Sequence, residues 1–411
     1  MQFVVERVCG LDVHQATVVA CLLIVAKDRT IKKQVRTFGT TTRELIELRE
    51  WLQTEGCSQV GMESTGVYWK PVYTILEGAF ELIVANAERI KKVPGRKTDV
   101  KDAEWIADLL LHGLLKASFV PPQPIRELRD LTRYRRKLVE SQSAERNRLI
   151  KLLETANIKL ASVASDVFGV SGRLMLAALA EGVAQPEEMA NLAKRALRAK
   201  IPQLELALEG RMLEHHRYLL TVQLRRLAEV EGDITQLDER IQQKLQPYQK
   251  QLAWLQDIPG VDRTIMAVVI AELGIEMSVF GSVAKLAAWT GLCPGNHESA
   301  GKRKSGRTTR GNVHLKTALV EAALAASRKK GSYLRDKFYR LKARRGHKRA
   351  AVAIAHKILA SIYHMLSGEV PYHDLGDLYL DKLNKNAIAR NLVHRLERMG
   401  CKVTIEWQTA A

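Results

Sequence analysis

The sequence predicts an α/β domain at the N-terminus, followed by a long helical region and a mostly α-helical C-terminal domain. From Phe3 to about Leu115, apolar runs of strand length alternate with helical segments, which is typical of an α/β layer fold. The prolines of residues 120–124 then end this pattern, and helical periodicity follows. Because 411 residues are too many for a single core, we expect separate regions. Their predicted bounds are 1–120, 121–250, 251–372 and a tail at 373–411.

Acidic residues stand at the ends of two predicted strands. Residues 8–13 and 18–25 are apolar runs of strand type, and the first carries Asp12 near its end. Residues 59–66 predict another strand, in which Glu63 lies just before a helix that begins near Tyr68. Each of these carboxylates therefore follows a segment that we expect to be buried.

Two further acids begin a predicted helix. Asp99 and Asp102 lie three residues apart, where Thr98 predicts the N-cap of an apolar helix over residues 105–115. This spacing puts both carboxylates on one helical face. Taken singly, each acid is explained by a cap or a solvated charge. Taken in order, the four occupy the positions where an RNase H-like sheet would hold metal ligands, and two hard cations about 4 Å apart would relieve their repulsion.

The charge balance favours a polyanionic partner. The chain has 64 Lys and Arg against 45 Asp and Glu, a formal net charge of +19 and a pI near 9.7, which predicts salt-sensitive binding to nucleic acid. We expect no membrane association, since no apolar run approaches the roughly 20 residues that span a bilayer and no signal segment opens the chain. The five scattered cysteines indicate neither a disulfide framework nor a thiolate zinc site, so we expect an intracellular protein.

The middle region predicts two long helices with an insertion between them. Leu213, Leu220, Leu227, Ile234 and Ile241 recur every seven residues, which indicates a coiled-coil seam. An antiparallel hairpin within one subunit and a zipper between subunits both fit this seam. The preceding helix, from about residue 128 to 152, has a stripe broken by polar residues, so it packs imperfectly or carries function on its face. Residues 161–202 read as an insertion of short amphipathic helices. The polar residues that interrupt the apolar stripe of the first long helix are Arg135, Gln142 and Glu145.

The C-terminal region opens with an apolar turn at residues 258–263 that contains Gly260. The turn leads into a helix over residues 264–273 and resembles half of a helix-hairpin-helix element, in which turn amides contact a DNA phosphate. A capping turn without a ligand fits the same residues equally well. A second helix is predicted from Ser282 to Thr290.

A loop rich in glycine, serine and cations follows at residues 291–312. Its cations would hold phosphates, its glycines would let the backbone approach a ligand, and a hydroxyl among them could attack phosphorus. A plain phosphate-binding loop is the simpler interpretation, because most loop serines only satisfy turns. Helices are predicted at 313–329, 333–345 and 347–366, with basic faces that by default are solvated. The cations of the loop at residues 291–312 are Lys302, Arg303, Lys304, Arg307 and Arg310.

Five motifs, in the right order, resemble the insertion-sequence 110 family of DEDD transposases. They read GLDVH, MESTGVY, KTDVKDA, IPGV and GLCPGNHESAG, at residues 10–14, 62–68, 97–103, 258–261 and 291–301. The resemblance spans about Val8 to Ser367.

The resemblance implies a RuvC-like N-terminal domain joined by a coiled coil to a transposase domain. It implies that Asp12, Glu63, Asp99 and Asp102 are catalytic and bind Mg²⁺, as two ions. It also implies that Ser299 is the nucleophile that links covalently to DNA. Some members have Ser-Gly directly, whereas Ala300 separates Ser299 from Gly301 here, and Ser305 is the reserve candidate. The expected nucleic-acid-binding residues are Lys97, Gly260, Lys302, Arg303, Lys304, Arg307 and Arg310.

The resemblance also implies the partners. These are target and donor DNA, a noncoding guide RNA (a bridge RNA) that pairs with both, and further copies of the chain, as a dimer that assembles to a tetramer with composite sites. The expected location is the prokaryotic cytoplasm, at the nucleoid. Two other classes remain open from the residues alone: a Mg²⁺-dependent junction-resolving nuclease and a non-catalytic nucleic-acid-binding scaffold.

Overall fold

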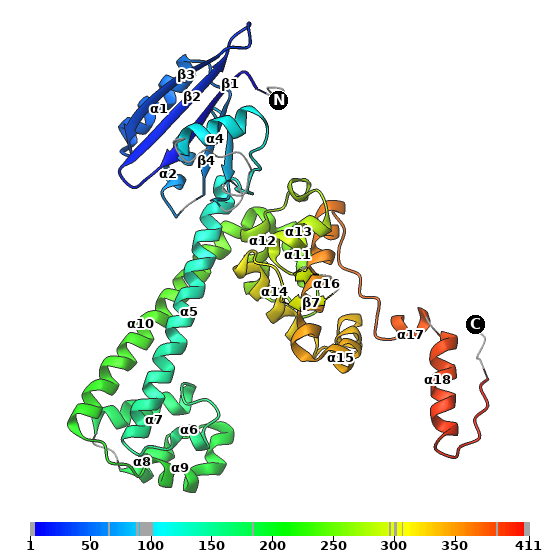
Figure 1. Cartoon of the computed structure of the whole chain (residues 1–411). Coiled ribbons are helices and arrows are strands. Elements are labelled where there is room, and N and C mark those ends of the chain that lie inside the picture. The colour runs from blue at the N-terminus through cyan, green and yellow to red at the C-terminus, as the bar shows by residue number, and fades with distance from the viewer. Residues whose placement is uncertain are drawn as a thin grey trace. The chain divides into compact units, whose positions relative to one another are not determined.

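The computed structural model divides into two compact units, Met1–Val120 and Pro121–Ala411 (Figure 1). It describes residues 5–64, 66–87, 90, 102–182, 185–295, 297–299, 302–305, 307–383 and 385–406, and of 297–299 and 302–305 the backbone alone. Each unit is described by itself below.

The first unit is built on a five-stranded sheet with the order β3-β2-β1-β4-β5. Its strands are β1 (Arg7–Val13), β2 (Thr17–Val25), β3 (Ile31–Gly39), β4 (Gln59–Glu63) and β5 (Glu81–Ala85). The first three strands pair antiparallel, while β1, β4 and β5 run parallel. This mixed α/β sheet is consistent with the RNase H-like start that the sequence predicts.

Helices cover both faces of this sheet. Leu11 of β1 packs in one core with Leu45 of α1 (Thr42–Thr54) and Val72 of α2 (Trp69–Leu76). Val8, which points the other way along the same strand, packs in a second core with α4 (Asp102–Leu111). The sequence predicted α4 over residues 105–115; the helix instead ends before Gly113, whose positive φ of 65° a helix interior does not allow.

The second unit contains two long helices, α5 (Gln123–Thr155) and α10 (Glu214–Leu245), that pair within one chain. Glu127 contacts Lys244, and Arg146 contacts Glu231, so residue numbers rise along one helix as they fall along the other. The chain thus forms the antiparallel hairpin, one of the two arrangements left open by the heptad pattern. Three heptad positions, Leu220, Leu227 and Ile241, are buried, whereas Leu213 precedes the helix and is 45% exposed.

The polar residues that interrupt the stripe of α5 reach across to α10. Arg135 donates to Asp238 from Nε and Nη2, at 2.5 and 3.0 Å. Gln142 donates to Glu231 at 3.1 Å, and the buried carboxylate of Glu145 contacts Arg226 at 2.8 Å. The helix therefore packs through polar pairs at these positions.

The insertion folds into short helices on one end of the α5–α10 pair. They are α6 (Leu160–Val163), α7 (Val170–Glu181), α8 (Pro186–Asn191), η1 (Arg195–Lys200) and α9 (Ile201–Leu208). Their buried residues share one core with Leu153 of α5 and Leu220 of α10. The insertion therefore stabilises that end of the pair.

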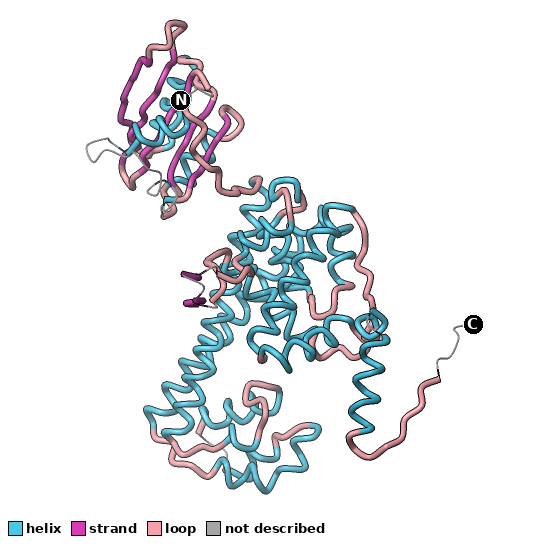
Figure 2. The backbone as a smooth tube through the Cα atoms, turned by 45° about the vertical axis from the view of Figure 1, so that its right-hand side comes forward, coloured by secondary structure: helices cyan, strands magenta, loops and turns pink. Residues whose placement is uncertain are grey.

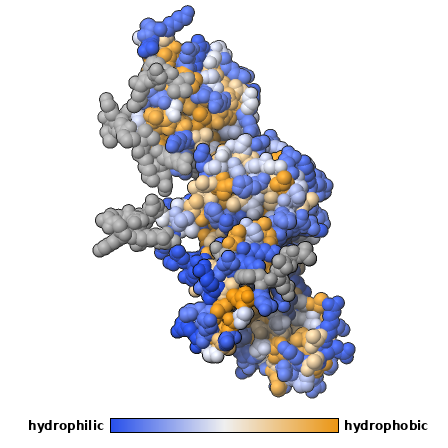
Figure 3. All heavy atoms as spheres, turned by 90° about the vertical axis from the view of Figure 1, so that its right-hand side faces the viewer, coloured by the Kyte–Doolittle hydropathy of each residue, from blue (hydrophilic) through white to orange (hydrophobic). Residues whose placement is uncertain are grey.

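Helices α11 (Gln249–Gln256), α12 (Arg263–Leu273), α13 (Val283–Thr290) and α15 (Tyr333–Arg345) pack around α16 (His347–Gly368) and α14 (Val313–Ala326), whereas α17 (Tyr379–Leu383) contacts α15, and α18 (Lys385–Glu397) contacts α17. Among the described helices, α16 is the one long and apolar enough to cross a membrane, but residues such as Ile354 and Ile358 are buried against its neighbours, as in a core helix. In the space-filling view, apolar patches lie between hydrophilic side chains (Figure 3). The other elements are η2 (Gln246–Tyr248), η3 (Met277–Phe280), β6 (His297–Ser299) and β7 (Lys302–Ser305).

Candidate active site

Asp12 and Glu63 lie at the same end of two neighbouring parallel strands. The register of β1 and β4 pairs Leu11 with Met62. The next residues, Asp12 and Glu63, therefore lie side by side on neighbouring strands, which are about 4.8 Å apart. Leu11 and Met62 belong to the core under α1 and α2. Because side chains alternate along a strand, the two carboxylates face the opposite side of the sheet, which α4 covers.

Asp102 is the first residue of α4, the helix that covers this face. The helix approaches β1 very closely at Gly10, where a Cβ would be 2.2 Å from the carbonyl oxygen of Ala103 and 2.4 Å from the amide nitrogen of Ala107. A Cβ on Gly61, the partner of Gly10 on β4, would be 2.9 Å from the side chain of Leu115 and 3.1 Å from that of Ile106 on α4. Glycine at position 10 therefore lets the start of α4 lie against β1, and glycine at position 61 leaves room for later side chains of the same segment.

The donor chemistry of these residues suits a hard divalent cation, which prefers carboxylate oxygens. Asp12 is 27% exposed on its side chain and accepts a contact from Nε2 of His14 at 3.1 Å. Within the residues that the structure describes, no three His, Cys, Asp or Glu side chains are gathered closely enough to hold a metal. Asp99 and Lys97 lie outside the described residues. The metal-binding role of the four acids stays a prediction.

Ser299 lies on a short antiparallel ribbon in the second unit, formed by β6 and β7 (Figure 2). In the backbone register Ser299 pairs with Lys302, Glu298 with Arg303, and His297 with Ser305. The two candidate serines thus occupy opposite ends of the ribbon: Ser299 adjoins the connection between the strands, and Ser305 is at the base. Lys304 lies on the same strand as Ser305, while Arg307 and Arg310 are exposed beyond it.

The base of the ribbon is fixed by backbone contacts. The amide of Gly295 donates to the carbonyl of Arg307 at 2.8 Å, and that of Thr309 donates to Cys293 at 3.1 Å. Gly291 has a φ of 76°, and a Cβ on Gly311 would be 2.4 Å from its amide nitrogen. Gly291 and Gly311 therefore allow the two backbone segments that carry them to pack closely together.

Gly260 has a packing role in the turn between α11 and α12. Its φ is 83°, and a Cβ there would be 2.2 Å from the carbonyl oxygen of Ala322 on α14. Asp262 caps α12, since its carboxylate accepts from the amide of Ile265 at 2.8 Å. Helix capping and packing account for the motif, and the contact of Gly260 with DNA stays a prediction.

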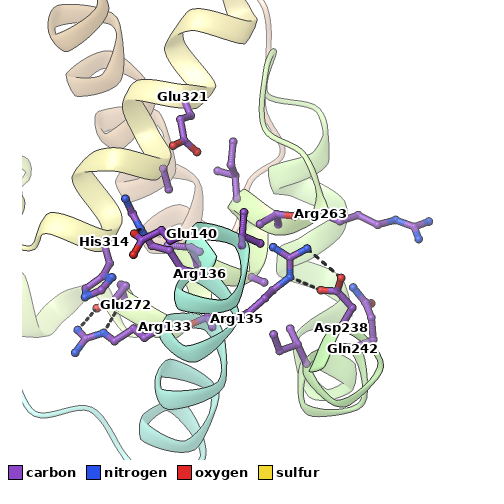
Figure 4. A pocket seen from close by; sticks show the side chains of 18 of the residues that line it. Arg133, Arg135, Arg136, Glu140, Asp238, Gln242, Arg263, Glu272, His314 and Glu321 are labelled. Atoms are coloured by element: carbon purple, nitrogen blue, oxygen red, sulfur yellow. Dashed lines mark hydrogen bonds and ion pairs between the residues drawn. The ribbon is translucent and has the colours of Figure 1, made fainter. Parts of the chain in front are cut away.

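A buried carboxylate that we did not single out from the sequence connects α5 to the end of the serine loop. Arg133 donates to both oxygens of Glu272, each at 2.8 Å (Figure 4), and Nδ2 of Asn312 donates to Oε2 of Glu272 at 2.6 Å. Arg129 contacts the same carboxylate at 3.3 Å. Asn312 also accepts from the amide of Leu315 at 3.0 Å and so caps α14. One sequence signal was available: Arg129 and Arg133 are spaced i, i+4 on α5.

This network sets the charge state of its members. Burial alone would raise the pKa of Glu272, but hydrogen bonding by Arg133 and the charges of Arg129 and Arg133 hold it below its ordinary value. Burial, aided by Arg133, Arg136 and Lys137, lowers the pKa of His314 despite the opposing charge of Glu272. We therefore assign an ionised Glu272 and a neutral His314 at pH 7.

Glu272 and His314 line a groove of about 850 Å³ between the α5–α10 pair and helices α12 and α14 (Figure 4). Its walls mix apolar side chains with paired charges such as Arg135 and Asp238. Nδ1 of His314 is buried without a hydrogen-bond partner in the described part of the chain. The groove lies beside the contacts of Arg133 and Asn312 with Glu272, which join α5 to α12 and to the end of the serine loop.

Two family models match the chain. One, described as a transposase of the DEDD type, matches residues 9–158, and the other, described as Transposase IS116/IS110/IS902 family, matches residues 252–340. The first match includes Asp12, Glu63, Asp99 and Asp102, and the second includes Ser299. A search of curated proteins found no match.

Proposed function

The chain belongs to the IS110 family of transposases, which act on DNA, and we propose that it is a site-specific recombinase that cuts and rejoins strands through a covalent phosphoserine at Ser299. The observation that carries the proposal is the level placement of Asp12 and Glu63 on the face that α4 covers. Carboxylates so arranged, in a chain of net charge +19, suit phosphoryl transfer on nucleic acid.

The RuvC-like first unit would hold and orient the scissile phosphate. We propose that Asp12, Glu63, Asp99 and Asp102 bind two Mg²⁺ ions, which neutralise non-bridging phosphate oxygens and lower the cost of deprotonating a hydroxyl. Gly10 supports this role, because it lets the start of α4, which carries Asp102, lie against β1, which carries Asp12. Nε2 of His14 lies 3.1 Å from Oδ2 of Asp12 and could help to orient that carboxylate.

The covalent step conserves phosphodiester bonds. The hydroxyl of Ser299 loses its proton and bonds to phosphorus, while the bond from phosphorus to one deoxyribose oxygen breaks and that oxygen takes up a proton. A deoxyribose hydroxyl of the exchanged strand then attacks the phosphoserine, and Ser299 regains a proton as it leaves. Lys302, Arg303, Lys304, Arg307 and Arg310 would stabilise the charge on the transferred phosphate.

The ribbon register supports Ser299 over Ser305. We propose that the phosphate approaches the end of the ribbon that Ser299 adjoins, whereas Ser305 pairs at the base beside the fixed backbone of Gly295 and Arg307. The order of residues before Ser299 also matches the family motif.

We further propose the assembly and the partners. A noncoding bridge RNA would pair with target and donor DNA, and the chain's positive charge would hold this RNA with both duplexes. The α5–α10 pair would act as a coiled-coil arm that joins dimers into a tetramer, with the acids of one subunit meeting the serine of another. Such an assembly would work in the prokaryotic cytoplasm, at the nucleoid.

The test is covalent trapping. Protein, Mg²⁺, guide RNA and end-labelled target or donor DNA are incubated, denatured and resolved by size. We expect a protein–DNA adduct with the unchanged chain and with Ser305→Ala, and none with Ser299→Ala or Asp102→Asn. An adduct that survives Ser299→Ala would refute the assignment of the nucleophile.

The second candidate is a junction-resolving nuclease that uses water. It is favoured by one observation: the acids belong to a sheet unit that is compact without the serine ribbon. Strand cleavage that persists in Ser299→Ala and is lost in Asp12→Asn would establish it. If the protein binds DNA but breaks no strand with any divalent metal, it is a non-catalytic nucleic-acid-binding scaffold.

A further inference from the structure

Unpaired cations gather where α15 meets α16. Residues 342–349 contain five Lys or Arg and no Asp or Glu. All five side chains are exposed, and none makes an ion pair within the described part of the chain. We call this cluster the basic corner; it consists of Lys342, Arg344, Arg345, Lys348 and Arg349.

The cations of the α5–α10 pair are held differently. Arg135 contacts Asp238, Arg226 contacts Glu145, and Lys137 contacts Glu140. Each of these cations has a carboxylate partner within the chain. Five like charges kept together without a carboxylate repel one another, so the basic corner is better suited to an anionic partner.

An exposed aromatic ring lies beside the basic corner on the same helical stripe. Tyr339 is 47% exposed, whereas its neighbour Phe338 on the same helix is buried. Arg335 and Lys342, at i−4 and i+3, place their cationic groups 5.3 and 5.4 Å from the ring centre. A ring presented between two cations can stack on a nucleobase while the cations reach the flanking phosphates.

A shallow hollow of about 320 Å³ adjoins the ring. It is lined by Arg335, Asp336, Tyr339, Asp377, Leu378 and Asp381. Arg340 engages Asp336 and Asp381 at 2.8 and 2.6 Å and so fixes that wall. The carboxylates repel phosphate but accept hydrogen bonds from exocyclic amino groups, so the hollow suits a base and the basic corner suits the backbone.

We propose that Tyr339 and the basic corner bind an unpaired DNA strand, with a base stacked on Tyr339 and phosphates held by Arg335, Lys342 and the rest of the corner. Stacking on the ring needs a base released from its duplex, which strand exchange provides. The assignment to DNA deepens the proposed function and rests on it, since the family acts on DNA.

The stacking arm of the test measures binding of a labelled single-stranded oligodeoxynucleotide by fluorescence anisotropy. All proteins carry Ser299→Ala, so the result does not depend on covalent chemistry. We expect Tyr339→Ala to weaken binding by about 5- to 100-fold and Tyr339→Trp to retain it. An oligonucleotide with abasic sites should bind the parent protein weakly, and Tyr339→Ala should bind it with the same affinity as the parent.

Matched controls make this arm specific. Tyr218 is 69% exposed on α10, and Tyr218→Ala should leave binding unchanged. The proposal is overturned if Tyr339→Ala binds the DNA strand like its parent, if Tyr218→Ala loses as much, or if the loss appears only with an oligoribonucleotide of the same sequence.

The charge arm measures how binding falls with salt. Replacing Lys342 and Arg345 by Gln should reduce the slope of log affinity against log salt by about 1.4, since each phosphate contact on a single strand contributes about 0.7. The paired cations Lys137 and Arg225, replaced in the same way, should leave the slope unchanged. Equal slopes for the two double variants would contradict a phosphate-binding role for the basic corner. Failure of this binding alongside an intact serine adduct would refute the site and leave the proposed function standing.

Discussion

Arg133 and Glu272, which are 139 positions apart in the sequence, form a bidentate ion pair in which both N–O distances are 2.8 Å. The Glu272 side chain is 1% exposed and also holds Asn312, the residue that ends the serine loop. A carboxylate inside the second unit thus fixes α5, α12 and α14 together. The α5 helix and the exit of the serine loop are coupled through this one side chain.

We predict that Glu272→Ala destabilises the protein by about 3–5 kcal/mol, because two arginines and an amide lose their acceptor in a buried site. The free energy of unfolding can be measured by urea titration with the tryptophan signal. Glu140→Gln is the matched control, since Glu140 pairs with Arg136 and Lys137 at the surface and should leave stability unchanged. Equal stability of the two variants would show that the network does not hold the helices.

The lowered pKa of Glu272 predicts an acid dependence. Its ionised form is favoured in the folded chain, so its contribution to stability is complete above the unfolded value, near 4.5, and is lost as pH falls through the folded pKa. The stability difference between the unchanged chain and Glu272→Gln should therefore be constant from pH 7 to 5 and shrink below about pH 4. Unfolding free energies across this range test it, and a difference that grows on acidification would contradict the assigned charge.

His314 predicts a separate dependence near neutrality. Burial is the largest cause of the lowered pKa of His314, and the positive charges of Arg133, Arg136 and Lys137 lower it further. The unfolded chain then binds a proton more readily, so stability should fall as pH drops below about 6.5. His314→Gln should flatten the change in unfolding midpoint between pH 7.5 and 5.5, whereas the exposed His394→Gln should not. Identical pH profiles for all three proteins would exclude a buried neutral His314.

Gly10→Ala should force α4 away from β1, because the new Cβ would meet backbone atoms at 2.2 and 2.4 Å. We expect a loss of about 1–3 kcal/mol, as for other overpacked sites, and loss of adduct formation as Asp102 moves. Gly232 supplies the control: a Cβ there meets nothing within 4 Å, and Gly232→Ala should stabilise α10 by about 0.5–1 kcal/mol. An unchanged unfolding midpoint in Gly10→Ala would disprove the close contact.

The sequence predicted elements whose signals are local. The helix over residues 333–345 has the predicted bounds, since Ser332 caps it and Gly346 ends it. Strands β1, β2 and β4 were predicted because their buried residues form apolar runs. β3 was not singled out: most of its residues are exposed, so its place in the sheet comes from backbone pairing with β2 that composition does not reveal.

The candidate site was predictable to a similar degree. Acids at strand ends follow from alternation and strand length, so Asp12 and Glu63 could be placed at one edge of the sheet. The Glu272 network could not, because its partners lie on α5 and before α14, and contacts between distant segments depend on packing that no local pattern encodes. The roles of Gly260 and Gly291 also needed the fold, since their motifs fit a ligand site and a packed turn alike.

Binding of Mg²⁺ should stabilise the chain through the four acids. A ligand that binds the folded state at about 100 times its dissociation constant adds about 2.7 kcal/mol, so the unfolding midpoint should rise on replacing EDTA with Mg²⁺. Asp12→Asn and Glu63→Gln should lose most of this rise, because each removes an oxygen ligand from the level pair on β1 and β4. Glu104→Gln is the matched control: Glu104 lies on the same helix as Asp102 but contacts Lys33 at 3.2 Å, and its variant should keep the rise. Calorimetry with both buffers distinguishes these outcomes, and a rise of equal size in all four proteins would place the metal elsewhere.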